Sequence, residues 1–252
     1  MKFLRFQSKE GSSKFGLLKE SEIFEIEGDV FGEYGVTQIS YPLAELKLLP
    51  PCIPTKIVAV GLNYRDHAEE MKKPLPAEPL IFMKPATAVI GHEDKIIYPE
   101  HMSSRVDYEG ELSVVIGKVA KWVSKDEALN YVFGYTCIND VTARDLQVKD
   151  VQYTRAKGFD TFAPVGPWIE TELDTSNLEI STFLNGEVRQ HSRTSELIFK
   201  VPQLISFISK VMTLLPGDII ATGTPSEIGP MKRGDKVEVN IEGIGILRNY
   251  VE

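Results

Sequence analysis

The segment RVDYEGELSVVIG, residues 105–117, places a carboxylate at every second position and then continues as an apolar run. Side chains of a β-strand point alternately to its two faces, so Asp107, Glu109 and Glu111 would all project to the same side. Carboxylates this close raise one another's pKa or require a cation, and burial makes their ionisation more costly. The fold must therefore bring a positive partner or solvent to this strand.

Glu109 and Glu111 flank Gly110, and their backbone spacing of roughly 6.5–7 Å allows both carboxylates to converge on one ion. Asp140, at the end of the apolar segment YTCIND, is a natural third ligand because strand ends deliver side chains to the rims of sites. Carboxylates without Cys or His suit Mg²⁺ or Mn²⁺, and also Ca²⁺, better than zinc. The spacing leaves a second reading open, an edge strand charged to discourage aggregation.

The segment GLNYRDHAEEM, residues 61–71, holds a second group of polar residues. In a helix over this segment, His67 and Glu70 are three residues apart and share a face. A carboxylate beside an imidazole fixes its tautomer and raises its basicity, so the pair could act as a general base toward water. A surface helix with an incidental charge pair is the alternative. Asp66 and Glu69 are expected on the solvated face.

Two loop segments offer further groups for a substrate. Lys157 lies in YTRAKGFDTFAP among aromatic residues. A lysine there could hold a carboxylate, stabilise an enolate or simply extend its ammonium group to solvent. In IIATGTP, the hydroxyls of Thr222 and Thr224 and the N–H of Gly223 would form a small nest for a substrate carboxylate. An ordinary turn after a strand is the other reading of this segment.

Composition and missing motifs exclude several classes of protein. The net charge of -8 and the lack of a basic stripe argue against nucleic-acid binding. The 2 cysteines, Cys52 and Cys137, are too few for a Cys-based zinc site. There is no P-loop, G-x-S-x-G, H-E-x-x-H or G-x-G-x-x-G motif. Since neither a signal peptide nor an apolar run of roughly 20 residues is found, we expect a cytoplasmic protein without a membrane partner.

Proline and glycine divide the chain into two parts. Residues 1–54 read as a small N-terminal β unit with tight turns, ending in the connector LLPPCIP. Residues 55–252 alternate strand-like runs with a few helices and form the main domain. The predicted fold class is therefore α+β, mostly β. The proline-rich loop 72–85 is either an ordinary exposed loop or a lid over a site.

Hydrophobic periodicity places the main elements. The expected strands are 56–63, 112–117, 133–140 and the two arms of a hairpin that turns at Asn185-Gly186. The expected helices are 64–71, 125–132, 141–150 and 201–214.

Several stretches, in order along about residues 55–252, resemble the fumarylacetoacetate hydrolase family. They are GLNYRDHAEE, FMKP, DYEGELSVVIG, GYTCINDVTARDLQ, LNGEVRQHSRTSELIF and LLPGDIIATGTPSEIG. The resemblance implies the family's mixed β-roll with a few flanking helices, and a homodimer. Two features depart from the animal fumarylacetoacetase. The N-terminal unit is much shorter, and Leu62 and Asn63 stand where that enzyme has residues that make further polar contacts to ligand and substrate. The chain thus resembles the smaller bacterial members, such as acylpyruvate hydrolases and 2-hydroxyhepta-2,4-diene-1,7-dioate isomerases.

The resemblance also implies roles for the acidic strand and the histidine helix. Glu109, Glu111 and Asp140 match the family's ligands to a divalent metal, usually Mg²⁺ or Mn²⁺. The metal would be the positive partner that the acidic strand requires. His67 and Glu70 match the family's water-activating dyad.

The other matches concern the substrate. Lys157 and Gln147 match residues that contact the substrate or the developing enolate, and we assign Lys157 a catalytic role. Thr224, with Gly223 beside it, matches the substrate-binding Gly/Thr loop.

Together these parts predict a metal-dependent hydrolase that cleaves the C–C bond of acylpyruvate-like 2,4-dioxo acids, such as fumarylpyruvate or acetylpyruvate. The metal would draw charge into a bound enolate, and the dyad would deliver hydroxide to the distal carbonyl. The same enolate permits hydroxymuconate-type isomerisation or decarboxylation of oxaloacetate, although decarboxylation alone leaves the dyad unexplained. The rival from another class is a non-catalytic metal- or ligand-binding protein, against which the intact dyad and Lys157 argue.

Overall fold

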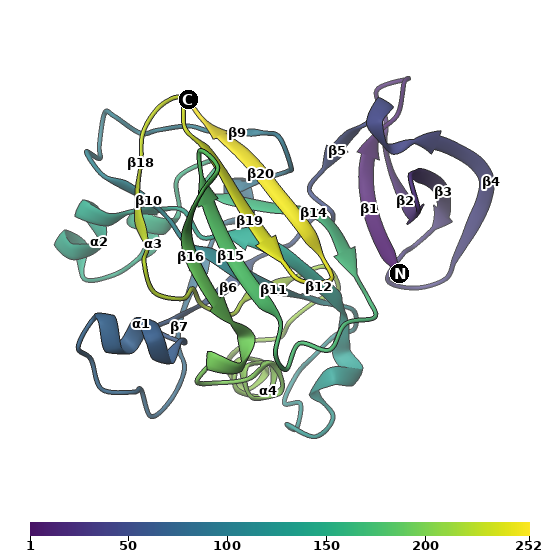
Figure 1. Cartoon of the computed structure of the whole chain (residues 1–252). Coiled ribbons are helices and arrows are strands. Elements are labelled where there is room, and N and C mark those ends of the chain that lie inside the picture. The colour runs from purple at the N-terminus through teal and green to yellow at the C-terminus, as the bar shows by residue number, and fades with distance from the viewer.

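The computed structural model describes residues 1–252 and is built mainly from strands. The strands form a 12-stranded, a 3-stranded and a 5-stranded sheet. Figure 1 shows the sheets of the main body, with the N-terminal strands in purple beside it. The structure is therefore of the α+β class and mostly β, as predicted.

The 12-stranded sheet has the order β4-β3-β2-β1-β14-β12-β11-β17-β6-β7, with β5 paired to β1 and β8 to β14. Its N-terminal strands are β1 (Lys2–Gln7), β2 (Ser13–Lys19), β3 (Glu22–Gly28), β4 (Tyr34–Pro42) and β5 (Lys47–Leu49). The others are β6 (Ile57–Gly61), β7 (Leu80–Lys84), β8 (Val89–Ile90), β11 (Gly110–Ile116), β12 (Val132–Asn139), β14 (Ala163–Glu170) and β17 (Ile219–Ala221). The acidic strand β11 lies between β12 and β17 and is buried throughout, so the edge-strand reading is wrong.

The two smaller sheets complete the main body. The 3-stranded sheet contains β13 (Thr142–Ala143), β10 (Val106–Tyr108) and β18 (Gly229–Met231). The 5-stranded sheet contains β16 (Glu187–Arg193), β15 (Glu179–Leu184), β19 (Lys236–Ile241), β20 (Gly245–Val251) and β9 (Lys95–Ile96). The predicted hairpin is confirmed, because β15 and β16 pair across Asn185-Gly186 and both turn residues have positive φ.

Helices are few and short. The α-helices are α1 (Arg65–Glu70), α2 (Arg144–Asp150), α3 (Thr154–Lys157) and α4 (Val201–Val211). The 3₁₀ helices are η1 (Leu43–Glu45), η2 (Ala86–Ala88), η3 (Ala128–Tyr131) and η4 (Thr194–Glu196). The expected helix over 125–132 is only the short η3, because the chain already enters β12 at Val132.

The alternation of β11 decides where its acidic side chain goes. Leu112, Val114 and Ile116 belong to a core cluster of 24 buried residues, to which β15, β19 and α4 also contribute. Val115 belongs to a different cluster of 15 buried residues. Glu111 shares the parity of Val115, so it leaves the strand on the face away from the larger cluster.

The N-terminal strands extend the main sheet. In β1, Lys2 pairs with Glu170 and Phe3 with Ile169 of β14. The N-terminal ammonium group also donates to the Glu170 carboxylate at 2.6 Å. Phe3 packs in the same cluster as Ile169. A division into domains at residues 54 and 55 stays a prediction, but the hydrogen bonding runs across it.

Asp218 joins two strands of the main sheet at their starts. Its buried carboxylate accepts hydrogen bonds from Thr55 N at 3.0 Å, Thr55 Oγ1 at 2.6 Å and Leu215 N at 2.8 Å, and it pairs with Lys56. Burial alone would raise the pKa of this carboxyl, but the bonds from Lys56 and Thr55 outweigh it and hold the pKa below its usual value.

Replacing Asp218 with asparagine is therefore expected to lower the free energy of unfolding by about 2–3 kcal/mol near neutral pH. A depressed folded-state pKa gives stability that is complete above the ordinary pKa and lost as the pH falls through the lowered one. The difference in free energy of unfolding between wild type and variant should thus become smaller only in acid. Urea unfolding measured from neutral to acidic pH tests the prediction, with the exposed Asp126→Asn as control. A difference that stayed constant into acid would contradict it.

Candidate metal centre and active site

Three buried carboxylates meet at one end of β11 and β12. Glu109 lies just before β11, Glu111 lies within it, and Asp140 directly follows β12. The two strands pair antiparallel with Gly110 opposite Asn139, which brings these positions together. One carboxylate oxygen from each acidic residue lies within 4.8 Å of the others, and all three residues are buried. The structure therefore assembles the triad that the sequence predicts.

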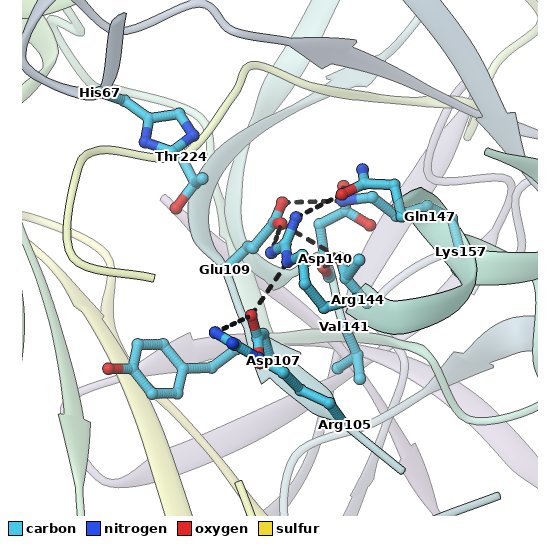
Figure 2. Close-up of polar contacts among 12 residues, drawn as sticks. His67, Arg105, Asp107, Glu109, Asp140, Val141, Arg144, Gln147, Lys157 and Thr224 are labelled. Carbon is cyan, nitrogen blue, oxygen red and sulfur yellow. Dashed lines mark hydrogen bonds and ion pairs between the residues drawn. The ribbon is translucent and has the colours of Figure 1, made fainter. Parts of the chain in front are cut away.

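Basic side chains pair with the triad, and Figure 2 shows Lys157 and Arg144 beside Glu109 and Asp140. Lys157 Nζ donates to Glu109 Oε2 at 2.7 Å and to Asp140 Oδ2 at 2.6 Å. Lys84 Nζ donates to Asp140 Oδ1 at 2.6 Å, and the Arg144 guanidinium pairs with Glu109. Both lysine side chains are at most 2% exposed, so these ion pairs lie in an environment that water screens little.

The charges are unequally compensated within the triad. Burial by itself would raise the pKa of Glu109, but Lys157 and Arg144 outweigh it and lower the pKa to about 2. Burial, and then the nearby Asp140 and Glu109 carboxylates, hold the pKa of Glu111 well above its ordinary value. Glu111 accepts the N–H of Gly223 at 2.7 Å and makes no ion pair. It is therefore the position at which a proton or another cation is required.

This donor set fits a hard divalent cation. Its ligand atoms are carboxylate oxygens without Cys or His, which suits Mg²⁺ or Mn²⁺ and would also accept Ca²⁺. A divalent cation would bring to Glu111 the positive charge that its surroundings do not supply.

Asp107 does not join the triad, although the alternation predicts that it shares a face with Glu109 and Glu111. It lies in β10 of the 3-stranded sheet, and the strand breaks at Glu109 before β11 enters the 12-stranded sheet. Its carboxylate accepts Arg105 Nε and Arg144 Nε, both at 2.9 Å. Two guanidinium groups are therefore the positive partners of this residue.

The predicted dyad lies on the wall of the same cavity. His67 Nδ1 and Glu70 Oε2 of α1 are 2.9 Å apart, and Glu227 N donates to Glu70 Oε1 at 3.1 Å. The cavity has a volume of about 480 Å³. The predicted residues that line it are His67, Glu70, Glu109, Glu111, Asp140, Gln147, Lys157 and Thr224, whereas Thr222 and Gly223 do not. In Figure 2, His67 and Thr224 lie on one side of Glu109 and Gln147 and Lys157 on the other.

One expectation about α1 is wrong. Asp66 is half-buried and not on the solvated face, because its carboxylate accepts Ser192 Oγ at 2.6 Å and His67 N at 2.7 Å. These bonds tie the start of α1 to β16. Glu69 is exposed, as expected.

The Gly/Thr loop does not form the expected nest. Thr222 Oγ1 donates to the carbonyl of Leu112 at 2.9 Å, and Thr224 Oγ1 donates to that of Gly110 at 3.0 Å. The Gly223 N–H, predicted to bind substrate, donates instead to Glu111. All these donors are used inside the protein, where they hold the loop against β11. A role of Thr224 toward substrate stays a prediction.

Gln190 is a buried residue that the sequence analysis does not identify. Its Oε1 accepts the N–H of Gly110 at 3.0 Å, and its Nε2 donates to Thr224 Oγ1 at 2.9 Å and to the carbonyl of Pro225 at 3.0 Å. It thereby connects the triad strand to the loop that continues to Glu227 and the dyad. In the strand EVRQHSR, Gln190 stands among other polar residues, so the sequence carries no signal that marks it as buried.

Lys84 and Arg144 are also missed as partners of the triad. Lys84 is a lone basic residue at the end of the apolar run LIFMK, and Arg144 follows Asp140 at the start of a helix. A buried charge must be paired, so a lysine inside such a run indicates an acidic partner. The sequence does not say which acid that is.

The chain matches known families and proteins over most of its length. Residues 56–252 match the family model described as fumarylacetoacetate (FAA) hydrolase, C-terminal, and residues 1–51 match the model described as Rv2993c-like, N-terminal. The chain is 44% identical to the oxaloacetate tautomerase YisK of Bacillus subtilis over 225 residues, which covers 84% of this chain and 75% of that protein. None of the helices has the length and apolar character that a membrane span requires.

Solved structures show the same architecture. The crystal structure of 5-carboxymethyl-2-hydroxymuconate delta-isomerase from Mycobacterium smegmatis matches with a TM-score of 0.94 and 45% identity, covering 100% of this chain and 99% of that one. Maleylpyruvate hydrolase from Sphingobium sp. SYK-6, in complex with manganese(II) and pyruvate, matches with a TM-score of 0.82 and 28% identity, covering 100% and 98%. With its acidic triad, its fold and its family match over residues 56–252, the chain belongs to the fumarylacetoacetate hydrolase family.

Proposed function

We propose that this protein is a divalent-metal-dependent enzyme that moves a proton at the carbon beside the keto group of a short 2-oxo acid, as in keto–enol tautomerisation of oxaloacetate. The observation that carries the proposal is the His67–Glu70 pair, which opens into the same cavity as the acidic triad. Carbon acids of this kind need a base and a means to stabilise negative charge on the keto oxygen.

The residues divide these tasks. Bound by Glu109, Glu111 and Asp140, Mg²⁺ or Mn²⁺ would supply the Lewis acid that stabilises charge on the keto oxygen. The Glu70 carboxylate holds the proton of His67 on Nδ1, which leaves Nε2 as the base that takes the substrate proton.

The other predicted residues assist. Lys157 keeps Glu109 and Asp140 ionised and in place, and its proximity to the cavity also lets it attract an anionic substrate. Gln147 and Thr224 offer polar atoms on the wall of the cavity that orient the substrate.

The relatives favour proton transfer as the outcome. The tautomerase at 44% identity and the isomerase structure at 45% identity are both named for reactions that relocate a proton without consuming water. The dyad then acts on a C–H bond of the substrate.

Hydrolysis of acylpyruvates, the function predicted from the sequence, is the second candidate. It is supported by the likeness to maleylpyruvate hydrolase and by a dyad that is equally suited to take a proton from water. The two functions share the metal site and differ in what His67 deprotonates.

The experiment compares metal-stripped protein with Mg²⁺- or Mn²⁺-loaded protein on enol oxaloacetate, acetylpyruvate and fumarylpyruvate. We expect metal-dependent loss of the enol absorbance of oxaloacetate, faster than any cleavage. Faster cleavage of an acylpyruvate would make the protein a hydrolase. Decarboxylation of oxaloacetate alone would remove the base role from the dyad, and no turnover on any substrate would favour the non-catalytic reading.

Replacing His67 with alanine is expected to lower turnover by about 10²–10⁴-fold, because the substrate proton then has no positioned acceptor. Affinity for Mn²⁺ should not change, since His67 is not among the triad ligands. Steady-state kinetics and metal titration test both statements. Glu69→Gln, an exposed neighbour on the same helix, is the matched control. Full turnover by the alanine variant would contradict the assignment of the base.

A further inference from the structure

We propose that Arg105 binds a second carboxylate of the substrate and so selects dicarboxylic acids. The inference rests on the proposed function, because it concerns the same cavity, and it adds the subsite that decides which 2-oxo acids bind. Arg105 lies on the cavity wall.

The backbone of Arg105 is fixed before any substrate arrives. Its carbonyl accepts the N–H of Arg144 at 2.9 Å, and its own N–H donates to Ser103 Oγ at 3.3 Å. Ser103 Oγ in turn donates to Asp145 Oδ1 of α2 at 2.6 Å. The turn is thereby attached to α2, so the backbone at Arg105 need not be ordered when the arginine binds a ligand.

The guanidinium of Arg105 has donors to spare. Nε and Nη2 donate to Asp107 at 2.9 and 3.2 Å, and the structure gives Nη1 no partner within the protein. Asp107 is fully buried, whereas the Arg105 side chain is 51% exposed. Arg144 Nε also donates to Asp107. Two guanidinium groups therefore share one carboxylate, and the exposed guanidinium of Arg105 presents uncompensated positive charge and free N–H groups.

The other cations of the cavity are differently placed. Lys157 is paired with two carboxylates of the triad, and Arg144 is shared among Asp107, Glu109 and Gln147. Lys73 also lines the cavity, but it belongs to the exposed loop that follows α1. Arg105 thus combines a fixed position with unused donors, which the planar guanidinium presents in the fork geometry that a carboxylate accepts.

The position of Arg105 suits the far end of a short substrate. A chain of ion pairs runs from Arg105 through Asp107 and Arg144 to Glu109. Arg105 is therefore near the triad but not in contact with it. With the carboxylate and keto oxygens of a 2-oxo acid turned to the triad, the carboxylate at the other end of a short dicarboxylic acid would reach this guanidinium.

The test measures binding, so that it does not depend on turnover. Malate and lactate share a 2-hydroxy acid head, and only malate carries a second carboxylate. Their dissociation constants are measured by calorimetry with Mn²⁺-loaded wild type, Arg105→Gln, Arg105→Lys and the control Arg233→Gln. Arg233 is an exposed residue paired with Glu100 and does not line the cavity.

We expect Arg105→Gln to weaken malate binding about tenfold or more and to leave lactate binding unchanged. Arg105→Lys should lie between wild type and the glutamine variant, which supports the inference even where the glutamine variant folds poorly. Equal weakening of both ligands, an unchanged preference in Arg105→Gln, or no malate binding by wild type would overturn it. Tight malate binding by a protein without turnover on oxaloacetate would instead refute the proposed function and keep the subsite.

Discussion

Replacing Glu111 with glutamine is expected to lower metal-dependent turnover about a thousandfold, and yet to leave the metal-free protein at least as stable as wild type. Glu111 is buried beside Glu109 and Asp140 and makes no ion pair, so its ionised form is unfavourable without a divalent cation. Glutamine has nearly the same shape, can still accept the Gly223 N–H and carries no charge to bury. Activity and stability should therefore change in opposite directions.

Thermal unfolding with and without Mn²⁺ measures the second half of this prediction. A site-bound ion at a hundred times its dissociation constant stabilises wild type by about 2.7 kcal/mol. Glu111→Gln should show almost none of this stabilisation, whereas the exposed Glu187→Gln should show all of it. A metal-free Glu111→Gln protein that melts well below wild type would mean that Glu111 is ionised and compensated without the metal.

Replacing Lys157 with methionine is expected to lower the free energy of unfolding by about 3–5 kcal/mol and to remove most activity. The Lys157 ammonium is the shared partner of Glu109 and Asp140, and all of these groups are buried. Methionine fills a similar volume but leaves two carboxylates with less positive charge in a place that excludes water. Urea unfolding of the metal-free proteins measures the loss.

Lys14→Met is the control for this change. Lys14 pairs with Glu25 at 2.7 Å, much as Lys157 pairs with its partners, but its side chain is 31% exposed. Water and salt screen such a pair, so its removal should shift the unfolding transition only slightly. If the two lysine variants lost the same stability, burial would not be what makes the Lys157 pairs strong.

Glu109, Glu111 and the dyad could be predicted because each pair is close in the sequence. Glu109 and Glu111 are separated only by Gly110, at the point where β11 begins, and His67 and Glu70 are three residues apart in a helix. Asp140 is distant in the sequence and is predicted only from its place at the end of a strand. The hairpin at Asn185-Gly186 follows from turn chemistry in the same way.

The cations of the site could not be assigned by such rules. The ion pair between Lys84 and Asp140 joins residues 56 positions apart, and the one between Arg144 and Glu109 joins residues 35 apart. Only the packing of strands from different parts of the chain determines these partners. Asp107 could not be placed by such rules either. Strand alternation predicts that it points to the same side as the triad, but the chain passes from one sheet to another at Glu109, and the alternation does not continue across that break.

The pairing of β1 with β14 has a consequence for how this protein could be divided or recombined. Two family models meet between residues 51 and 56, so the N-terminal residues are matched by a model of their own. In the structure these residues are not separate from the rest of the chain. Strand β1 pairs with the edge of β14, and Phe3 belongs to the same buried cluster as Ile169 of β14. A protein that began at this junction would expose the β14 edge and an apolar surface, which favours self-association. Any other N-terminal segment joined to residues 56–252 would need a strand that pairs with β14. The exposed edge of β14, more than the linker, therefore limits which segments can replace the natural one.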